Sequence, residues 1–183
     1  FGINKIPSGE KDPLGLRRAA TGILHIILEK KLNLDLKELL EQAQSDYATA
    51  LENNDTTHQV LNFIYERLRF MYAERGKNAN VFHAVLANMP TNLLDFVKRF
   101  DAVSKFNKLP EAKDLVEIYK RVRNILSKTK KPSGVKFDKK LIVEKAEQNL
   151  AKVIEKESET INKLYKNKNY FETLELLVKA KPA

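Results

Sequence analysis

The chain contains no cysteine and no tryptophan among its 183 residues, and it has only 6 glycines and 6 prolines. Without cysteine it forms no disulfide and no thiolate metal site, which suits a reducing cytoplasm. No apolar run approaches the ~18 residues of a membrane span. We therefore expect a cytoplasmic protein that does not cross a membrane, and the scarcity of turn-forming residues favours long helices over many short strands.

Sequence motifs for catalysis and metal binding are also missing. The three histidines form neither an H-x-x-x-H nor an H-E-x-x-H pair, because they lie far apart at His25, His58 and His83. His25 lies among isoleucines and leucines, where a core or helix-face role is favoured over a catalytic one. There is no Gly-rich phosphate loop and no G-x-S-x-G motif. We therefore expect no catalytic residue, metal or cofactor in this chain.

Helical periodicity runs through the sequence, and no segment alternates with the period of a strand. The expected fold class is all-α, a helical bundle. Helices are predicted at residues 13–30, 36–51, 56–76, 80–88, 91–103, 110–127, 138–167 and from 170 onward. The run Asn53-Asn54-Asp55 predicts a boundary between a short N-terminal helical segment (1–55) and a helical domain (56–183), and the turn-rich stretch 128–138 predicts a linker.

Local signals predict where several helices begin and end. Asp12 is expected to cap the first helix, with Pro13 at its first position, and Asp35 to cap the second. Gly76 is a candidate C-terminal glycine for the third helix. In the helix 110–127, spacing predicts a buried apolar face of Leu115, Tyr119, Val122, Ile125 and Leu126.

Positive charge is concentrated in one part of the chain. The formal net charge is +9, and the stretch 98–140 holds 14 Lys or Arg against 5 Asp or Glu, so it accounts for the whole excess. A localised basic stretch is typical of a protein that binds nucleic acid. A solvated, lysine-rich surface explains the same charge equally well.

The helix 110–127 carries the most suggestive arrangement within this stretch. Lys120, Asn124 and Ser127 share one side at i, i+4 and i+7. The other candidates for RNA contact are Arg121, Arg123 and Lys128. Lys and Arg suit phosphates, and Asn and Arg suit base edges, which is what binding a single-stranded RNA loop requires. The alternative is the ordinary solvated face of an amphipathic helix.

A second candidate patch combines arginines with tyrosines in the helix 56–76. Arg69 and Tyr72 lie three residues apart and share a face, and Arg67 lies beside them. A ring beside a guanidinium can stack on an unpaired base, although core packing of Tyr65 and Tyr72 explains the tyrosines equally well.

Three segments resemble bacterial glycyl-tRNA synthetase β subunits. The first, FGINKIPSGEKDPLGLRRAATGILHIIL, is similar to the family run G-I-G-x-x-P-x-G-x-x-D-P-x-x-L-R-R-x-A, with Asn4 where the family has a second Gly. The second, FIYERLRFMYAERGKNANVFHAVLANMPTNLLDFVKRFDAV, resembles E-R-L-R…G…V-x-x-A-V-L-A…P…D-F…R…A-V. The third, KRVRNIL, resembles K-R-V-x-N-I-L. All three occur in order and at compatible spacing over nearly the whole chain.

The resemblance implies a part of a glycine–tRNA ligase. Its β subunit recognises tRNA-Gly, and its α subunit activates glycine with ATP and Mg²⁺ in an α₂β₂ tetramer. Residues 1–55 would end a helical body with an HD-like region, although the His-Asp motif of that fold is absent. Residues 56–183 would form a DALR-like anticodon-binding domain, C-terminally truncated because the family continues with two further helices. The chain, which opens on Phe1, is thus expected to be a fragment.

Two alternatives remain open from the sequence. One is a helical assembly or interaction domain whose basic stretch is solvated surface, for which exposed apolar side chains in residues 1–55 would be evidence. The other is a helical RNA-binding protein unrelated to the synthetases.

Overall fold

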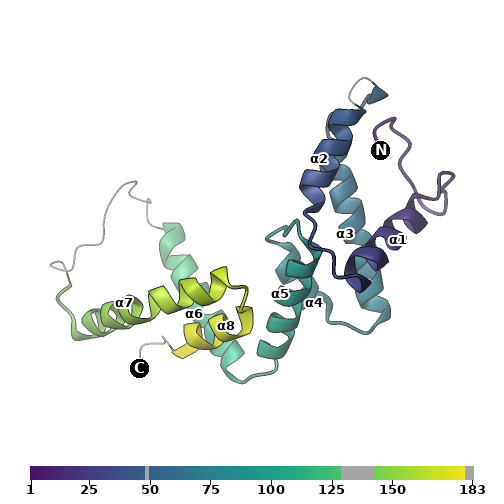
Figure 1. Cartoon of the computed structure of the whole chain (residues 1–183). Coiled ribbons are helices and arrows are strands. Elements are labelled where there is room, and N and C mark those ends of the chain that lie inside the picture. The colour runs from purple at the N-terminus through teal and green to yellow at the C-terminus, as the bar shows by residue number, and fades with distance from the viewer. Residues whose placement is uncertain (48–49, 129–141, 180–183) are drawn as a thin grey trace. The chain divides into compact units, whose positions relative to one another are not determined.

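The computed structural model describes residues 1–47, 50–128 and 142–179 (Figure 1). These residues form eight helices and no strand, which confirms the predicted all-α class. The helices are α1 (Leu16–Glu29), α2 (Leu36–Asp46), α3 (Thr56–Glu74), α4 (Ala79–Leu86), α5 (Leu93–Phe106), α6 (Glu111–Lys128), α7 (Lys145–Lys166) and α8 (Tyr170–Lys179). Except for Lys128, the predicted linker 128–138 lies outside the described residues, as does the predicted start of a helix at Asp138.

The chain packs as two compact units, residues 1–100 (unit 1) and 101–183 (unit 2). In unit 1, α1 and α2 both pack against α3, so residues on either side of position 55 contact one another. Packing says nothing about where a family domain ends, and the predicted boundary at residue 55 stays a prediction.

The start of α1 differs from the prediction. The helix begins at Leu16 and not at Pro13, because Gly15 adopts a left-handed conformation with φ of 64°. Asp12 still caps the first turn, whose backbone amides have no acceptor within the helix. Its two carboxylate oxygens accept hydrogen bonds from the amides of Leu16 and Arg17, each at 2.9 Å. The hydrogen bond from the Arg17 amide lowers the pKa of Asp12.

Other local predictions are confirmed. Asp35 caps α2 by accepting from the amides of Lys37 and Glu38 at 2.9 and 3.2 Å. Gly76 follows the end of α3 with φ of 64°, the left-handed conformation that favours glycine. Asn4 also has a positive φ, 57°, which explains why glycine suits this position and why asparagine is tolerated there.

An aromatic cluster forms the core of unit 1. Phe96 is 0% exposed, and its ring centroid lies 5.0 Å from that of Phe82 and 5.7 Å from that of Tyr65. Tyr72 meets Phe82, Phe96 and Phe100 edge-on at centroid distances of 5.6, 5.9 and 4.7 Å. Edge-to-face packing at these distances is favourable beyond the apolar area that it buries. This cluster joins α3, α4 and α5.

Polar contacts join the start of α2 to the loop before α5. The side chain of Thr91 donates a hydrogen bond to the Asp35 carboxylate, and the Leu36 amide donates to the Thr91 carbonyl at 2.9 Å. Nearby, the buried Tyr65 hydroxyl donates to the Pro90 carbonyl. The bonds between Thr91 and the start of α2 connect segments more than 50 residues apart. Together with the amides of Lys37 and Glu38, Thr91 gives the Asp35 carboxylate three hydrogen-bond donors.

Replacement of Asp35 with asparagine is expected to reduce the acid sensitivity of unit 1. Burial raises the pKa of Asp35, but hydrogen bonds from Thr91 and from the amides of Glu38 and Lys37 outweigh it and hold the pKa below its ordinary value. A lowered folded-state pKa stabilises the fold above the unfolded-state pKa, and this stabilisation is lost as pH falls through the folded-state value. The free energy of unfolding should therefore fall less steeply below about pH 4 in D35N than in the wild type. Superimposable pH profiles would contradict this.

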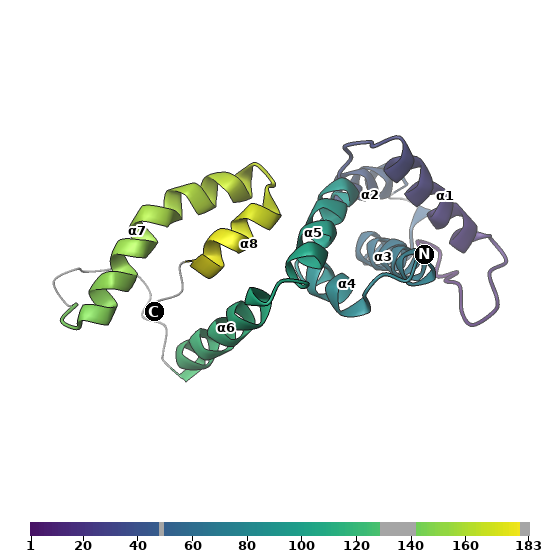
Figure 2. The ribbon, with the colours of Figure 1, turned by 90° about the horizontal axis from the view of Figure 1, so that it is seen from below.

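Unit 2 has a small core among its described residues. Helix α8 folds back along α7 (Figure 2) and also contacts α6. Tyr170 and Thr173 are buried, and the Tyr170 ring lies 5.6 Å from that of Tyr165. No described residue of α7 is buried.

The apolar face predicted for α6 is not buried. Tyr119 is 62% exposed and Ile125 59% exposed, Val122 and Leu126 are exposed as well, and Leu115 is half-buried. Helical spacing correctly grouped these side chains on one face, but the described residues do not cover that face. The spacing of apolar residues shows which of them share a side of a helix, but it does not show whether another element packs against that side.

Replacement of Leu126, which is 54% exposed, with alanine is therefore expected to change the free energy of unfolding of this chain by less than about 0.5 kcal/mol. A buried leucine would instead lose about 2–5 kcal/mol. Urea unfolding followed by circular dichroism distinguishes the two, and a loss in the larger range would show that the face is covered.

Candidate nucleic-acid interface

The five candidate residues of α6 all lie on the surface. Lys120, Arg121, Arg123, Asn124 and Lys128 are exposed. The Ser127 hydroxyl donates a hydrogen bond at 2.9 Å to the Asn124 carbonyl and so binds the backbone of its own helix. The C-terminal half of α6 therefore presents a cationic strip, by which we mean these five side chains.

The helix dipole explains only part of this charge distribution. Glu111 and Asp114 lie in the first turn of α6 and Lys128 in the last, as the dipole favours. The effect is worth about 0.3–1 kcal/mol for each charge and fades beyond the terminal turn. Lys120 and Arg121 lie further inside, so the dipole does not account for them.

The cations of the strip are also unpaired within the described part of the chain. No ion pair there involves Lys120, Arg121 or Arg123, whereas Arg99 of α5 is held by Asp95 with Nε and Oδ2 2.7 Å apart. An exposed, unpaired cation can neutralise a phosphate without first giving up a protein partner. Five further lysines of the basic stretch lie outside the described residues, at positions 130, 131, 136, 139 and 140.

The second predicted patch has a different composition from the expected one. Tyr72 is only 9% exposed, and its ring is packed in the aromatic core, so it offers no face to a base. The partly exposed aromatic ring is Phe70, at 45%, with the guanidinium carbons of Arg67 and Arg69 at 4.4 and 4.9 Å from its centroid. These are cation–π distances. Arg67 and Arg69 thus flank Phe70 rather than Tyr72.

Helical spacing contained the signal that would have found Phe70. Phe63, Arg67 and Phe70 follow one another at i, i+4 and i+7, whereas Tyr65 and Tyr72 belong to the stripe that includes the buried Leu68. The Arg67 guanidinium carbon also lies 5.5 Å from the Phe63 centroid. Of the two interpretations left open for Tyr65 and Tyr72, core packing is confirmed, and a ring of Tyr72 beside Arg69 on the surface is not found.

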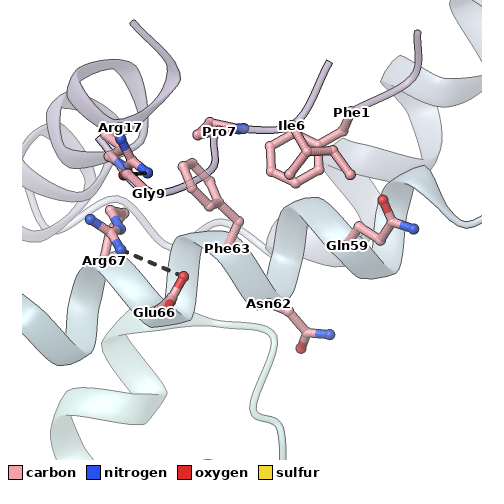
Figure 3. A pocket seen from close by; sticks show the side chains of 10 residues that line it. All are labelled: Phe1, Ile6, Pro7, Gly9, Arg17, Gln59, Asn62, Phe63, Glu66 and Arg67. Carbon is pink, nitrogen blue, oxygen red and sulfur yellow. Dashed lines mark hydrogen bonds and ion pairs between the residues drawn. The ribbon is translucent and has the colours of Figure 1, made fainter. Parts of the chain in front are cut away.

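A pocket of about 620 Å³ adjoins this patch in unit 1 (Figure 3). Its floor comes from α3, through Phe63 and Arg67, and the N-terminal segment with Arg17 of α1 lies on the opposite side (Figure 3). Arg17 Nη2 donates to the Gly9 carbonyl at 2.7 Å and so holds that segment. The full lining is Phe1, Ile6, Pro7, Gly9, Arg17, Gln59, Asn62, Phe63, Glu66 and Arg67.

The remaining titratable side chains form no further site in the described residues. His25 Nδ1 lies 3.2 Å from a carboxylate oxygen of Glu29, and His58 Nδ1 lies 3.5 Å from one of Asp55, as helix-surface histidines do. No three His, Asp or Glu side chains of the described chain gather as metal ligands would. None of its helices combines the length and apolarity needed to cross a bilayer.

Comparison with known proteins identifies the family. A family profile described as "Glycyl-tRNA synthetase beta subunit" matches residues 1–87. The glycine–tRNA ligase β subunit of Coxiella burnetii is 46% identical over 182 residues, which cover 99% of this chain and 26% of that protein. The chain belongs to the glycyl-tRNA synthetase β subunit family.

Other relatives of the same name agree. The β subunit of Colwellia psychrerythraea is 42% identical over 99% of this chain, and that of Psychromonas ingrahamii is 39% identical over 93%. The chain spans about a quarter of the length of these glycyl-tRNA synthetase β subunits, 26% and 25% respectively. The resemblance predicted from the three motifs is thus confirmed.

Proposed function

We propose that this chain is a tRNA-binding part of a glycine–tRNA ligase β subunit. The observation that carries the proposal is the cationic strip of α6, exposed and unpaired among the described residues, in a chain whose relatives are named as subunits of this ligase. In this role the chain acts in the cytoplasm on tRNA-Gly, together with an α subunit in an α₂β₂ tetramer.

The contribution of the chain is positional. Lys120, Arg121 and Arg123 neutralise phosphates and release counterions, which supplies affinity without regard to sequence. Asn124 and the arginines can also donate hydrogen bonds to base edges, which supplies specificity for an anticodon arm. Binding of one end of the tRNA by this chain orients the other end for a reaction at a distant site.

Bond making is assigned to the α subunit. The chain has no Gly-rich phosphate loop, and its described residues hold no cluster of metal ligands. The cofactors ATP and Mg²⁺ belong to the parent assembly in this proposal. Purified chain given glycine, ATP and tRNA should therefore form no glycyl-tRNA.

A second candidate function, subunit assembly, has its own support. Large apolar side chains are exposed on α1 and just after α2, among them Ile23 (44%), Ile26 (58%) and Tyr47 (65%). Such residues commonly mark a protein interface when they are contiguous. An I23S/I26S variant should lose co-sedimentation with the α subunit if this surface assembles the ligase, and should retain it if α1 has no such role. An RNA-binding protein outside the synthetases is not supported, given the relatives.

The tRNA-binding proposal is tested by comparing two tRNAs. The chain should bind tRNA-Gly more tightly than a tRNA of similar size with a different anticodon, measured by fluorescence anisotropy at one salt concentration. Equal affinities would contradict anticodon recognition and leave backbone binding. Absence of binding to both would contradict the proposal as a whole.

A further inference from the structure

The pocket between α3 and the N-terminal segment has two chemically distinct ends. Figure 3 shows the guanidinium groups of Arg17 and Arg67 at one end and Phe1 with Gln59 at the other, with the ring of Phe63 between them. Its volume of about 620 Å³ falls within the range of roughly 300–1,000 Å³ that is usual for small-molecule sites.

The arginine end is suited to an anion. Two guanidinium groups, of Arg17 and Arg67, and a single carboxylate, of Glu66, line the pocket, and Glu66 Oε2 lies 3.5 Å from Arg67 Nη2. Arg67 Nε is buried and makes no hydrogen bond within the described residues. Because Nε is closed to solvent, a phosphate would contact the part of the Arg67 side chain that is exposed, 18% of it, through a charge-assisted hydrogen bond. Among the described residues, the Arg17 guanidinium donates a hydrogen bond through only one nitrogen, Nη2, to the Gly9 carbonyl.

The opposite end is suited to a flat ring. The Phe1 and Phe63 centroids lie 5.0 Å apart with the rings tilted, so both contribute apolar surface to the pocket. At the rim, Gln59 Oε1 accepts from Asn53 at 3.0 Å, which leaves the Gln59 amide nitrogen as a donor for a base edge. Aromatic rings that stack on bases are worth about 1–3 kcal/mol per base.

An anion site next to an apolar ring site matches a nucleotide. We propose that this pocket binds one unpaired nucleotide of an RNA, with its phosphate on Arg17 and Arg67 and its base against Phe63 and Phe1. The proposal rests on the RNA-binding role of the chain, but it concerns unit 1, whereas the cationic strip of α6 belongs to unit 2. A paired nucleotide would not enter, because its base is held in the stack of a duplex.

The test uses adenosine 5′-monophosphate (AMP) as the probe and the Nε–H resonances of Arg17 and Arg67 in NMR spectra of the whole chain as the readout. AMP should shift both resonances, and R67Q should weaken AMP binding about tenfold, as expected for a charge-assisted hydrogen bond. R67K, which keeps the charge but not the planar fork, should also weaken it. R75Q is the matched control, because Arg75 is an exposed arginine that directly follows α3 and lies outside the pocket.

Competition distinguishes the source of the nucleotide. A hairpin RNA with an unpaired loop should displace AMP, and a fully paired duplex of equal length should not. The assignment is overturned if R67Q binds AMP as the wild type does, if inorganic phosphate binds as tightly as AMP, or if no RNA displaces AMP.

A triple variant of the strip, K120Q/R121Q/R123Q, separates this inference from the proposed function. It should still bind AMP. If R67Q retains full tRNA affinity while the triple variant loses it, the pocket assignment fails and the tRNA-binding function stands. If AMP binds in the pocket but tRNA does not bind the chain, the proposed function fails and the pocket is not an RNA site.

Discussion

Replacement of Phe96 with alanine is expected to lower the free energy of unfolding of unit 1 by about 3–5 kcal/mol. Phe96 is fully buried and contacts the rings of Tyr65, Tyr72 and Phe82, so its removal leaves a cavity that three other rings cannot fill without leaving their own positions. Because a domain of this size is stable by only about 5–15 kcal/mol, such a loss approaches its whole stability.

Urea unfolding followed by circular dichroism measures the effect, with F70A as the matched control. Phe70 is an aromatic residue of the same unit but is 45% exposed, and its packing is against the guanidinium groups of Arg67 and Arg69. Its replacement should cost about 1 kcal/mol or less. If F96A and F70A were equally destabilised, the aromatic cluster would not be the core of unit 1.

Neutralising three cations of α6 is expected to weaken tRNA binding by roughly 100-fold or more at low salt. The variant K120Q/R121Q/R123Q removes three charges that are exposed and have no ion-pair partner in the described chain. Removing one phosphate interaction should reduce affinity by roughly tenfold, since a hydrogen bond to a charged group contributes about 1.5 kcal/mol or more. Stability should change little, because exposed side chains carry little of the folding free energy.

The matched control removes the same net charge elsewhere. Lys145, Lys152 and Lys163 are exposed lysines of α7, and their replacement with glutamine also lowers the net charge by three. This variant should bind tRNA within a few-fold of the wild type. If both triple variants lost the same affinity, net charge alone would govern binding and the position of the strip would not matter.

The features that could be predicted from the sequence are those set by local physics. The caps at Asp35 and Gly76 and the all-α class follow from side-chain hydrogen bonding, backbone conformation and helical periodicity, which act within a few residues. The predicted start of α1 was wrong by three residues because a capping Asp12 can reach the first turn across a left-handed Gly15. A helix that begins at Pro13 and one that begins at Leu16 are both compatible with Asp12 as the capping residue.

Burial could not be predicted where it depends on distant segments. Val122 and Ile125 have the spacing of a core face and are exposed, whereas Tyr72 had the spacing of a surface pair with Arg69 and is buried against α5. The pocket around Arg17 and Arg67 is formed by segments about 50 residues apart, so no pattern within a short stretch of sequence predicts it. The surface position of the α6 cations followed correctly from the helical wheel, and their contact with tRNA stays a prediction.

The salt dependence of tRNA-Gly binding tests the central claim most directly. The logarithm of the association constant should be measured against the logarithm of salt concentration for the wild type and for K120Q/R121Q/R123Q. Each neutralised phosphate contributes a slope of about −0.7 to −0.9, so the variant's line should be shallower by about 2–3. Parallel lines of equal affinity would contradict the claim that this chain binds tRNA through α6.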